Sequence, residues 1–178
     1  PEQSSAVPLT AEYPQMAVLR AFTKTFAMAG LRLGYGICRE AGLWEQLYKN
    51  RQPWSVSLPA QVAGVAALEP QACGEYLERT RELLRQQREA LTSGLEGLGF
   101  KVYPSNANYL LFKAPWEIKG EADSLYEQCR LRGILIRDCK NFTGLTAGYY
   151  RVCVGRQEEN LYLLEQLGQI LDKGEGRQ

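Results

Sequence analysis

Hydrophobic residues recur along this chain with helical spacing in two long stretches. In the first, five leucines are separated by seven, seven, four and three residues, which puts them on one face of a helix. They are Leu77, Leu84, Leu91, Leu95 and Leu98. We therefore predict a long amphipathic helix over 72–98, ended by Gly99. A closing helix over 158–171 is predicted in the same way from Leu161, Leu164, Leu167 and Leu171.

Shorter apolar runs between turn residues predict the remaining elements. The predicted strands are 18–22, 33–38, 100–103, 107–113, 134–137 and 149–154, the first of them buried. The shorter predicted helices are 41–50, 59–68 and 121–132, and the predicted loops or turns are 1–15 and 23–32. The breaker-rich segment 52–59 predicts a hinge. This order of elements indicates an α/β protein in which residues 1–70 end one domain and residues 71–178 form a long helix and a smaller α+β domain.

Composition and charge limit the kinds of partner that this chain is expected to bind. The 178 residues carry a formal net charge of +1, which gives no broad basic surface for nucleic acid. The basic stretch 79–88 is interleaved with Glu78, Glu82 and Glu89 and predicts a solvated helix face. No apolar run reaches the roughly 18 residues that a membrane span needs, so a membrane partner is not expected.

The numbers of histidines and cysteines limit the catalytic mechanisms and metal sites that are possible within the chain. The sequence contains no histidine, which excludes histidine-dependent catalysis and histidine-ligated metal sites within the chain. Its five cysteines include no Cys-x-x-Cys pair, so no disulfide framework or metal site is predicted and a reducing, cytoplasmic location is the simpler interpretation. The first residues lack Met and open in mid-loop, which predicts a fragment of a longer protein.

A lysine and an arginine eight residues apart form the strongest chemical pattern. Lys24 follows the predicted buried strand 18–22, where a desolvated amine would be uncharged and nucleophilic. Arg32 lies beyond Gly30 and can hold a phosphate through two parallel hydrogen bonds, and Thr23 adds a hydroxyl. In isolation, a strand-edge lysine followed by a solvated arginine is the commoner arrangement, so the surrounding residues decide the interpretation.

These surrounding residues resemble the lysine motif of fold-type I pyridoxal-phosphate enzymes, which reads Ser/Thr-Lys, a short loop and Gly-x-Arg-x-Gly-Tyr. The matching residues are Thr23, Lys24, Gly30, Arg32, Gly34 and Tyr35. The resemblance implies pyridoxal 5'-phosphate as the cofactor, bound covalently by Lys24, with Thr23 and Arg32 on its phosphate. Ala21 departs from the family, which often has Ser or Thr there, so one phosphate hydrogen bond is missing or comes from elsewhere.

The same resemblance assigns the two predicted domains. Residues 1–70 would be the C-terminal part of the large cofactor-binding domain, and residues 71–178 the connecting helix and small substrate-binding domain. The family's pyridine-nitrogen aspartate, its ring-stacking aromatic and its glycine-rich phosphate-binding helix would all lie before Pro1. The chain alone is therefore expected to be inactive.

Two further arginines, Arg137 and Arg151, stand in apolar strands fourteen residues apart. An arginine buried there without an anion is unfavourable. A substrate carboxylate or phosphate is one possible partner. An internal bridge to an acidic side chain is the other, with Asp138 the nearest in sequence, and the spacing alone does not decide between them.

The segments around these arginines resemble the histidinol-phosphate aminotransferase branch, which includes threonine-phosphate decarboxylase. The resemblance implies that Arg137 and Arg151 bind the anionic groups of the substrate. Asn108, in Pro-Ser-Asn-Ala-Asn-Tyr, would face the active site, although a hydrogen bond at a strand end explains it equally. The sequence from Arg137 to Val152 resembles the decarboxylase more closely than it resembles the aminotransferase.

The function implied is that of a homodimeric pyridoxal-phosphate enzyme acting on a phosphorylated amino acid. It is most similar to a threonine-phosphate decarboxylase of cobalamin biosynthesis. A histidinol-phosphate-type aminotransferase is the alternative, and a non-catalytic regulator that binds the cofactor is the second alternative.

Overall fold

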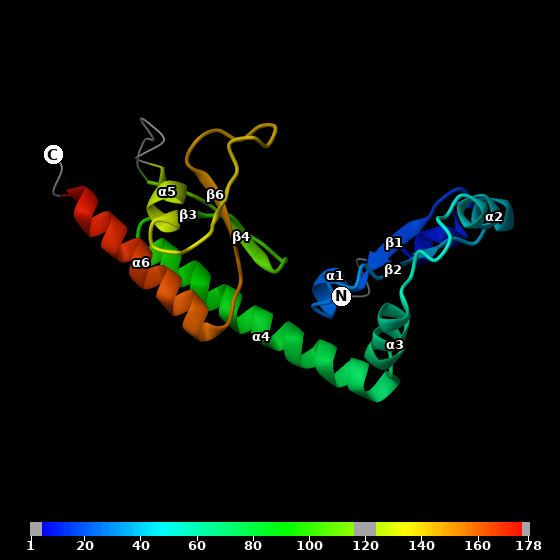
Figure 1. Cartoon of the computed structure of the whole chain (residues 1–178). Coiled ribbons are helices and arrows are strands. Elements are labelled where there is room, and N and C mark those ends of the chain that lie inside the picture. Colours follow the sequence, from blue (N-terminus) through cyan, green and yellow to red (C-terminus); the bar gives the residue numbers. More distant parts are fainter. Residues whose placement is uncertain (1–4, 116–123, 176–178) are drawn as a thin grey trace. The chain divides into compact units, whose positions relative to one another are not determined.

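The computed structural model describes residues 5–115 and 124–175 of the chain. The chain divides into two compact units, Pro1–Glu78 and Arg79–Gln178, and the division falls within one long helix, α4 (Pro70–Gly97) (Figure 1). The predicted domain boundary at residue 70 stays a prediction. The family-level expectation of an α/β chain agrees with the mixture of helices and sheets in the two units.

The first unit is built around an antiparallel pair of strands. Its elements are β1 (Val18–Ala21), α1 (Phe22–Thr25), β2 (Gly34–Ile37), α2 (Ala41–Lys49) and α3 (Leu58–Ala67), after a 3-10 turn over Pro8–Ala11. Strands β1 and β2 pair from Val18 with Ile37 to Ala21 with Gly34. Gly34 is required there, because a Cβ atom would lie 2.9 Å from the carbonyl oxygen of Arg20.

One sequence prediction for this unit is wrong. The strand 18–22 was expected to be buried, yet Leu19 is 81% exposed, because β1 has a single partner strand and no sheet layer surrounds it in the described unit. The segment 23–32, predicted to be rich in turns, begins within the four-residue helix α1. The predicted helices 41–50 and 59–68 are confirmed to within a residue, and they begin at side chains that accept backbone hydrogen bonds, Glu40 and Ser57.

The second unit contains a four-stranded antiparallel sheet. Its elements after α4 are β3 (Lys101–Val102), β4 (Tyr109–Lys113), α5 (Leu125–Arg130), β5 (Arg137–Asp138), β6 (Tyr149–Cys153) and α6 (Gln157–Glu175). The strand order is β3-β4-β6-β5. The predicted strand 134–137 is misplaced, because the ladder with β6 begins only at Arg137. Residues 121–123 of the predicted helix 121–132 lie outside the described residues.

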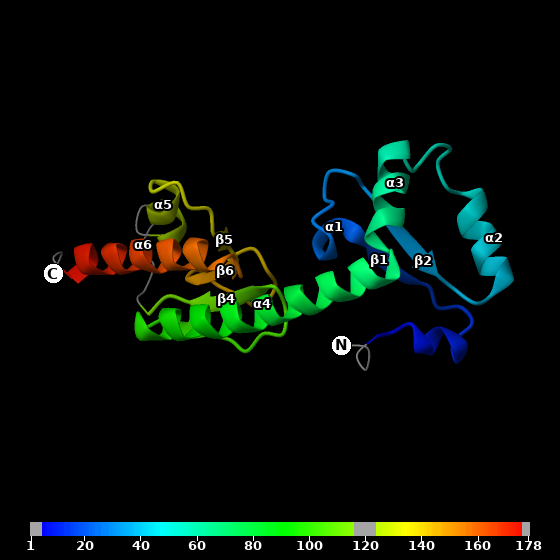
Figure 2. The same ribbon diagram turned by 90° about the horizontal axis from the view of Figure 1, so that it is seen from below.

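One face of this sheet packs against helices to form the core. Alternate residues of β4 and β6, such as Phe112 and Tyr150, contact Leu91 and Leu95 of α4 and Leu167 of α6 in one buried cluster. Helices α4 and α6 run side by side, as Figures 1 and 2 both show. The predicted core face of α6 is wrong at one position, because Leu161 is 58% exposed and Leu163 is buried instead.

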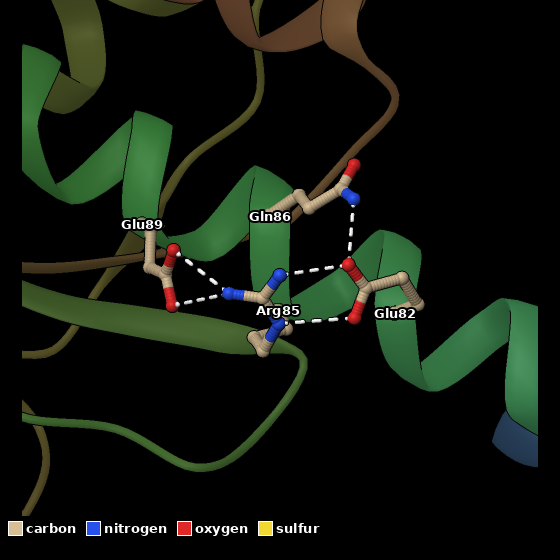
Figure 3. A network of polar contacts seen from close by, with 4 residues as sticks. All are labelled: Glu82, Arg85, Gln86 and Glu89. Carbon is tan, nitrogen blue, oxygen red and sulfur yellow. Dashed lines mark hydrogen bonds and ion pairs between the residues drawn. The ribbon is translucent and has the colours of Figure 1, made fainter.

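The opposite side of α4 is exposed and charged, as predicted for the stretch 79–88. The guanidinium of Arg85 bridges Glu82 at 2.7 Å and Glu89 at 3.1 Å, and Gln86 donates to Glu82 at 2.6 Å (Figure 3). The hydrogen bond from Arg85 lowers the pKa of Glu82 to about 2. Pairs three and four residues apart are helix-surface neighbours, so this network supports α4 locally.

Candidate functional site

The lysine motif lies at one end of the β1–β2 hairpin. The backbone N–H of Phe22 donates to the carbonyl of Leu33 at 3.1 Å, which extends the strand pairing by one step. Thr23 and Arg32 are the residues immediately beyond that step on either side, and Lys24 follows in α1. The hairpin therefore brings an amine, a hydroxyl and a guanidinium, separated by up to nine residues of sequence, to one end of a sheet.

Aromatic packing fixes the backbone beneath this group. Phe22 is buried, and its ring centroid lies 5.2 Å from that of Phe26 and 5.9 Å from that of Tyr35. The ring of Phe26 in turn stacks on Tyr76 at 5.7 Å. These rings anchor both ends of α1. Sequence analysis missed this support, because only the tertiary fold brings Tyr76 to the motif.

Arg32 has an unusual backbone conformation. Its φ is 54°, in the left-handed region, which costs a non-glycine residue about 1–2 kcal/mol. Its Nη1 donates to the carbonyl of Ala29 at 3.2 Å, which uses one of the five N–H donors of a guanidinium. Strained conformations of this kind cluster at ligand sites, so the conformation is consistent with a binding role.

The predicted burial of Lys24 is wrong for this chain. Lys24 is exposed and Thr23 is half-buried. The reason is the same as for Leu19, since the hairpin end has no covering layer within the described first unit. The hairpin end presents an accessible primary amine, a hydroxyl and a guanidinium, a set of groups that fits an aldehyde carrying a phosphate group.

The second group of predicted residues lies in the other unit, where the sheet brings them together. Arg137 of β5 and Arg151 of β6 are direct cross-strand partners. Side chains so placed share a face and have Cβ atoms about 5 Å apart. Like charges in this arrangement repel, so the pair gains from an anion placed between the two guanidinium groups.

The immediate surroundings of the two arginines are aromatic and neutral. The guanidinium of Arg151 lies 4.8 Å from the ring centroid of Tyr109. That of Arg137 lies 5.5 Å from the ring of Phe142, and its Nη2 donates to Asn141 at 3.0 Å. Sequence analysis named none of these three neighbours. Arg137 is exposed and Arg151 is half-buried, so both remain accessible within this unit.

The internal bridge to Asp138 is not present. Asp138 pairs with Tyr150 across the ladder, on the face opposite to Arg137, and its carboxylate lies 3.5 Å from Lys140. Among residues 5–115 and 124–175, neither Arg137 nor Arg151 forms an ion pair with an acidic side chain. The bridge to Asp138 that the sequence offered is therefore wrong, and the binding of an external anion by the two arginines stays a prediction.

The backbone of Asn108 takes part in the strand pairing, which leaves both interpretations of its side chain untested. Its carbonyl accepts a hydrogen bond from the N–H of Val154 at 2.9 Å, which continues the β4–β6 pairing. The neighbouring carbonyl of Ala107 accepts from Arg88 at 3.0 Å. The side chain of Asn108 is exposed, and its role toward a substrate stays a prediction.

The described ranges contain neither a candidate metal site nor a candidate membrane span. His, Cys, Asp and Glu side chains there form no group of three that could hold a metal ion. No helix among these residues combines the length and the apolar character that crossing a bilayer requires.

Comparison with known proteins identifies relatives over almost the whole chain. The family model for aminotransferase class I and II matches residues 1–167. A histidinol-phosphate aminotransferase of Nitratidesulfovibrio vulgaris is 40% identical over 159 residues, which are 89% of this chain and 40% of that protein. A protein of Caldanaerobacter subterraneus subsp. tengcongensis, provisionally named a threonine-phosphate decarboxylase, is 34% identical over 95% of this chain and 44% of its own length.

Solved structures agree with these relatives. The histidinol-phosphate aminotransferase of Clostridium acetobutylicum superposes with a TM-score of 0.87 at 28% identity, over 97% of this chain and 51% of that one. The present chain thus spans about half, or less, of the length of each of these proteins.

Proposed function

Because the chain belongs to the aminotransferase class I and II family, whose members depend on pyridoxal phosphate, we propose that it carries the cofactor lysine and the substrate-binding arginines of such an enzyme. The observation that carries the proposal is the pairing of Phe22 with Leu33, which gathers Thr23, Lys24 and Arg32 at one hairpin end. In this proposal Lys24 Nζ is the amine that binds the cofactor covalently. Arg32 and Thr23 hold the cofactor phosphate.

The protein's own residues have distinct tasks in this scheme. When bound, the cofactor supplies a sink for electrons released at the substrate carbon next to the amine. Lys24 Nζ would be the base that holds and moves a proton at that carbon. The exposed position of Lys24 means that water must be excluded by parts of the protein beyond the described residues.

Arg137 and Arg151 define the proposed substrate class. Their cross-strand pairing makes a site for a phosphate or carboxylate, which supports a small phosphorylated amino compound as the substrate. Arg137 and Arg151 would hold the anionic group of the substrate and so restrict its orientation. A misplacement of about 1 Å can cost about 10²-fold in rate, so this restriction would bear on the choice of reaction.

Two reactions fit these residues. Decarboxylation of threonine phosphate is our first proposal, because the sequence around Arg137 resembles that of the decarboxylase. Transamination of histidinol phosphate is the second, and it is supported by the names of the relatives that are 34–42% identical to this chain. Carbon dioxide release would support the first, and a product that forms only with an added keto acid would support the second. A role in cobalamin biosynthesis, a homodimer and a cytoplasmic location stay predictions.

The cofactor assignment can be tested on the chain by chemical trapping. Pyridoxal phosphate and then borohydride are added, and labelled lysines are identified by peptide mass spectrometry. If Arg32 and Thr23 hold the phosphate, Lys24 is labelled in preference to Lys49, which is also exposed. Pyridoxal, which lacks the phosphate, should lose this preference, and so should Arg32→Met.

Equal labelling of Lys24 and Lys49 by pyridoxal phosphate would contradict the assignment. A preference for Lys24 that persists with pyridoxal or in Arg32→Met would contradict the phosphate-binding role of Arg32 while leaving Lys24 as the reactive amine.

A further inference from the structure

The open face of the four-stranded sheet in the second unit carries a second pair of like charges. Lys101 of β3 and Lys113 of β4 are direct cross-strand partners, as Arg137 and Arg151 are at the other side of the sheet. Strand alternation puts all four cations on the face opposite to the helical core. Like charges in such pairs repel, so without a ligand the two pairs destabilise the folded protein.

Two tyrosines lie between these pairs and hold the lysines in place. The rings of Tyr103 and Tyr149 stack with centroids 6.0 Å apart, and their hydroxyl groups are 3.4 Å apart. The ammonium of Lys101 lies 5.3 Å from the ring centroid of Tyr103, and that of Lys113 lies 5.3 Å from Tyr149. Both ammonium groups are therefore attracted to fixed aromatic faces, next to two hydroxyl groups.

Acidic side chains of the described residues do not neutralise this face. In the parts of the chain that the structure describes, no Asp or Glu forms an ion pair with Lys101, Lys113, Arg137 or Arg151. Lys101 and Lys113 are exposed, and Tyr103 and Tyr149 are half-buried. The face thus offers cations and hydrogen-bond donors to solvent, and an anionic ligand complements it.

We propose that Lys101 and Lys113, with the hydroxyl groups of Tyr103 and Tyr149, form a second anion subsite beside the arginine pair. Lys113 pairs with Tyr149, and Arg151 lies two residues further along β6. Such diagonal neighbours have Cα atoms about 7–8 Å apart, a distance that one small molecule spans. The ligand of this face is therefore a small molecule with two anionic groups, one on the arginines and one on the lysines. This inference rests on the proposed function in taking the arginine pair as the first subsite.

Two synthetic probes that differ by one phosphate test the proposal on the chain. They are pentane-1,5-diyl bisphosphate and pentyl phosphate, and their dissociation constants are measured by titration calorimetry at low salt. We expect the bisphosphate to bind about tenfold more tightly, because it gains charge-assisted hydrogen bonds at the lysines. The amide resonances of Lys113 and Tyr149 should shift with the bisphosphate and not with pentyl phosphate.

Variants test whether the lysines cause the difference between the two dissociation constants. In Lys113→Met the ratio of the two dissociation constants should fall toward one, while the constant for pentyl phosphate changes by less than about twofold. Lys49→Met, which removes the same charge from the first unit, should keep the wild-type ratio. Arg151→Met should weaken both probes.

The proposal is overturned if the wild-type chain binds the two probes equally or binds neither. It is also overturned if Lys113→Met keeps the wild-type ratio. These outcomes are separate from the cofactor assignment, because they are judged by the effect of Lys113→Met on the ratio and no pyridoxal phosphate is added. Loss of selective Lys24 labelling with an intact probe ratio would reject the cofactor site alone.

Discussion

At the scale of single residues, Arg137 and Arg151 form a cross-strand pair that has no acidic partner among the described residues. Arg137 and Arg151 face each other across two strands, and the nearest acid in sequence, Asp138, is engaged with Lys140 on the other face. An ion pair that held the fold together would place a carboxylate between the guanidinium groups. The repulsion left in the free protein is what an anionic ligand would relieve.

Removing one arginine should therefore cost little stability. In Arg137→Met we expect the free energy of unfolding to change by less than about 0.5 kcal/mol, because relief of repulsion offsets loss of an exposed hydrogen bond to Asn141. Urea unfolding measures this, with Leu91→Ala, which should lose about 2–5 kcal/mol, as the core control. A loss above about 1.5 kcal/mol in Arg137→Met would indicate a structural role instead.

A buried thiol makes the second unit sensitive to alkaline pH. Burial raises the pKa of Cys129 from 9.0 to about 11. Below pH 9 the thiol is neutral in both states and its contribution to stability is complete. Between pH 9 and 11 the unfolded chain loses this proton while the folded chain keeps it, so stability falls as pH rises.

The expected loss across this window is at most about 2–3 kcal/mol, since each pKa unit corresponds to about 1.4 kcal/mol. Urea unfolding at pH 8, 9 and 10 should show a steeper fall for the wild type than for Cys129→Ala. Parallel pH profiles of the two proteins would show that Cys129 does not contribute. Cys153, which is exposed, offers a matched control as Cys153→Ala.

At the scale of elements, the contact of α4 with α6 depends on a glycine. A Cβ atom at Gly94 would lie 2.3 Å from Cδ1 of Leu164 and 3.2 Å from its Cγ, so the leucine must move. At Gly97, also in α4, a Cβ atom would meet nothing within 4 Å. Substitutions at these two positions therefore distinguish the effect of helix propensity from the effect of packing.

Gly97→Ala should stabilise the second unit by about 0.5–1 kcal/mol through helix propensity. Gly94→Ala gains the same propensity but overpacks the helix contact, which typically costs about 1–3 kcal/mol. We expect Gly94→Ala to be less stable than Gly97→Ala by about 1 kcal/mol or more, as measured by thermal or urea unfolding. Equal stabilities would mean that Leu164 repacks without strain.

At the scale of the whole molecule, the first unit exposes more apolar surface than a free domain usually does. Along α3, three residues with helical spacing are 63–77% exposed, namely Leu58, Val62 and Val65. Leu19 of β1 and Trp54 are also exposed. Contiguous apolar surface of this kind marks an interaction surface, and the relatives that the chain matches have more than half of their length beyond the matched part.

The chain alone is therefore expected to turn over little or no phosphorylated amino acid in the presence of pyridoxal phosphate. An exposed Lys24 leaves water at the reacting centre, and a water-filled site weakens the electrostatic interactions on which catalysis depends. Carbon dioxide release and keto-acid-dependent product formation measure this, with Lys24→Ala as the blank. Turnover typical of intact enzymes, at about 1–10³ per second, would contradict the expectation.

Local sequence determined most of the elements and the family. The spacing of leucines predicted α4, and the segment from Thr23 to Tyr35 identified the cofactor family, because helical periodicity and a short motif are properties of neighbouring residues. The assignments that failed were burial at Leu19 and Lys24, the start of β5, and the exposed Leu161. Each of these depends on what packs against the segment, which residues nearby in sequence do not specify.

Only the tertiary structure decided which distant side chains meet. Strand register made Arg137 and Arg151 direct partners and turned Asp138 to the other face, because a shift of one residue would reverse every side chain on a strand. The same register aligned Lys101 with Lys113 and brought Tyr103 against Tyr149. The sequence by itself determined which chemical groups this protein has, and pairing between strands far apart in the chain decided which of them lie together on one face.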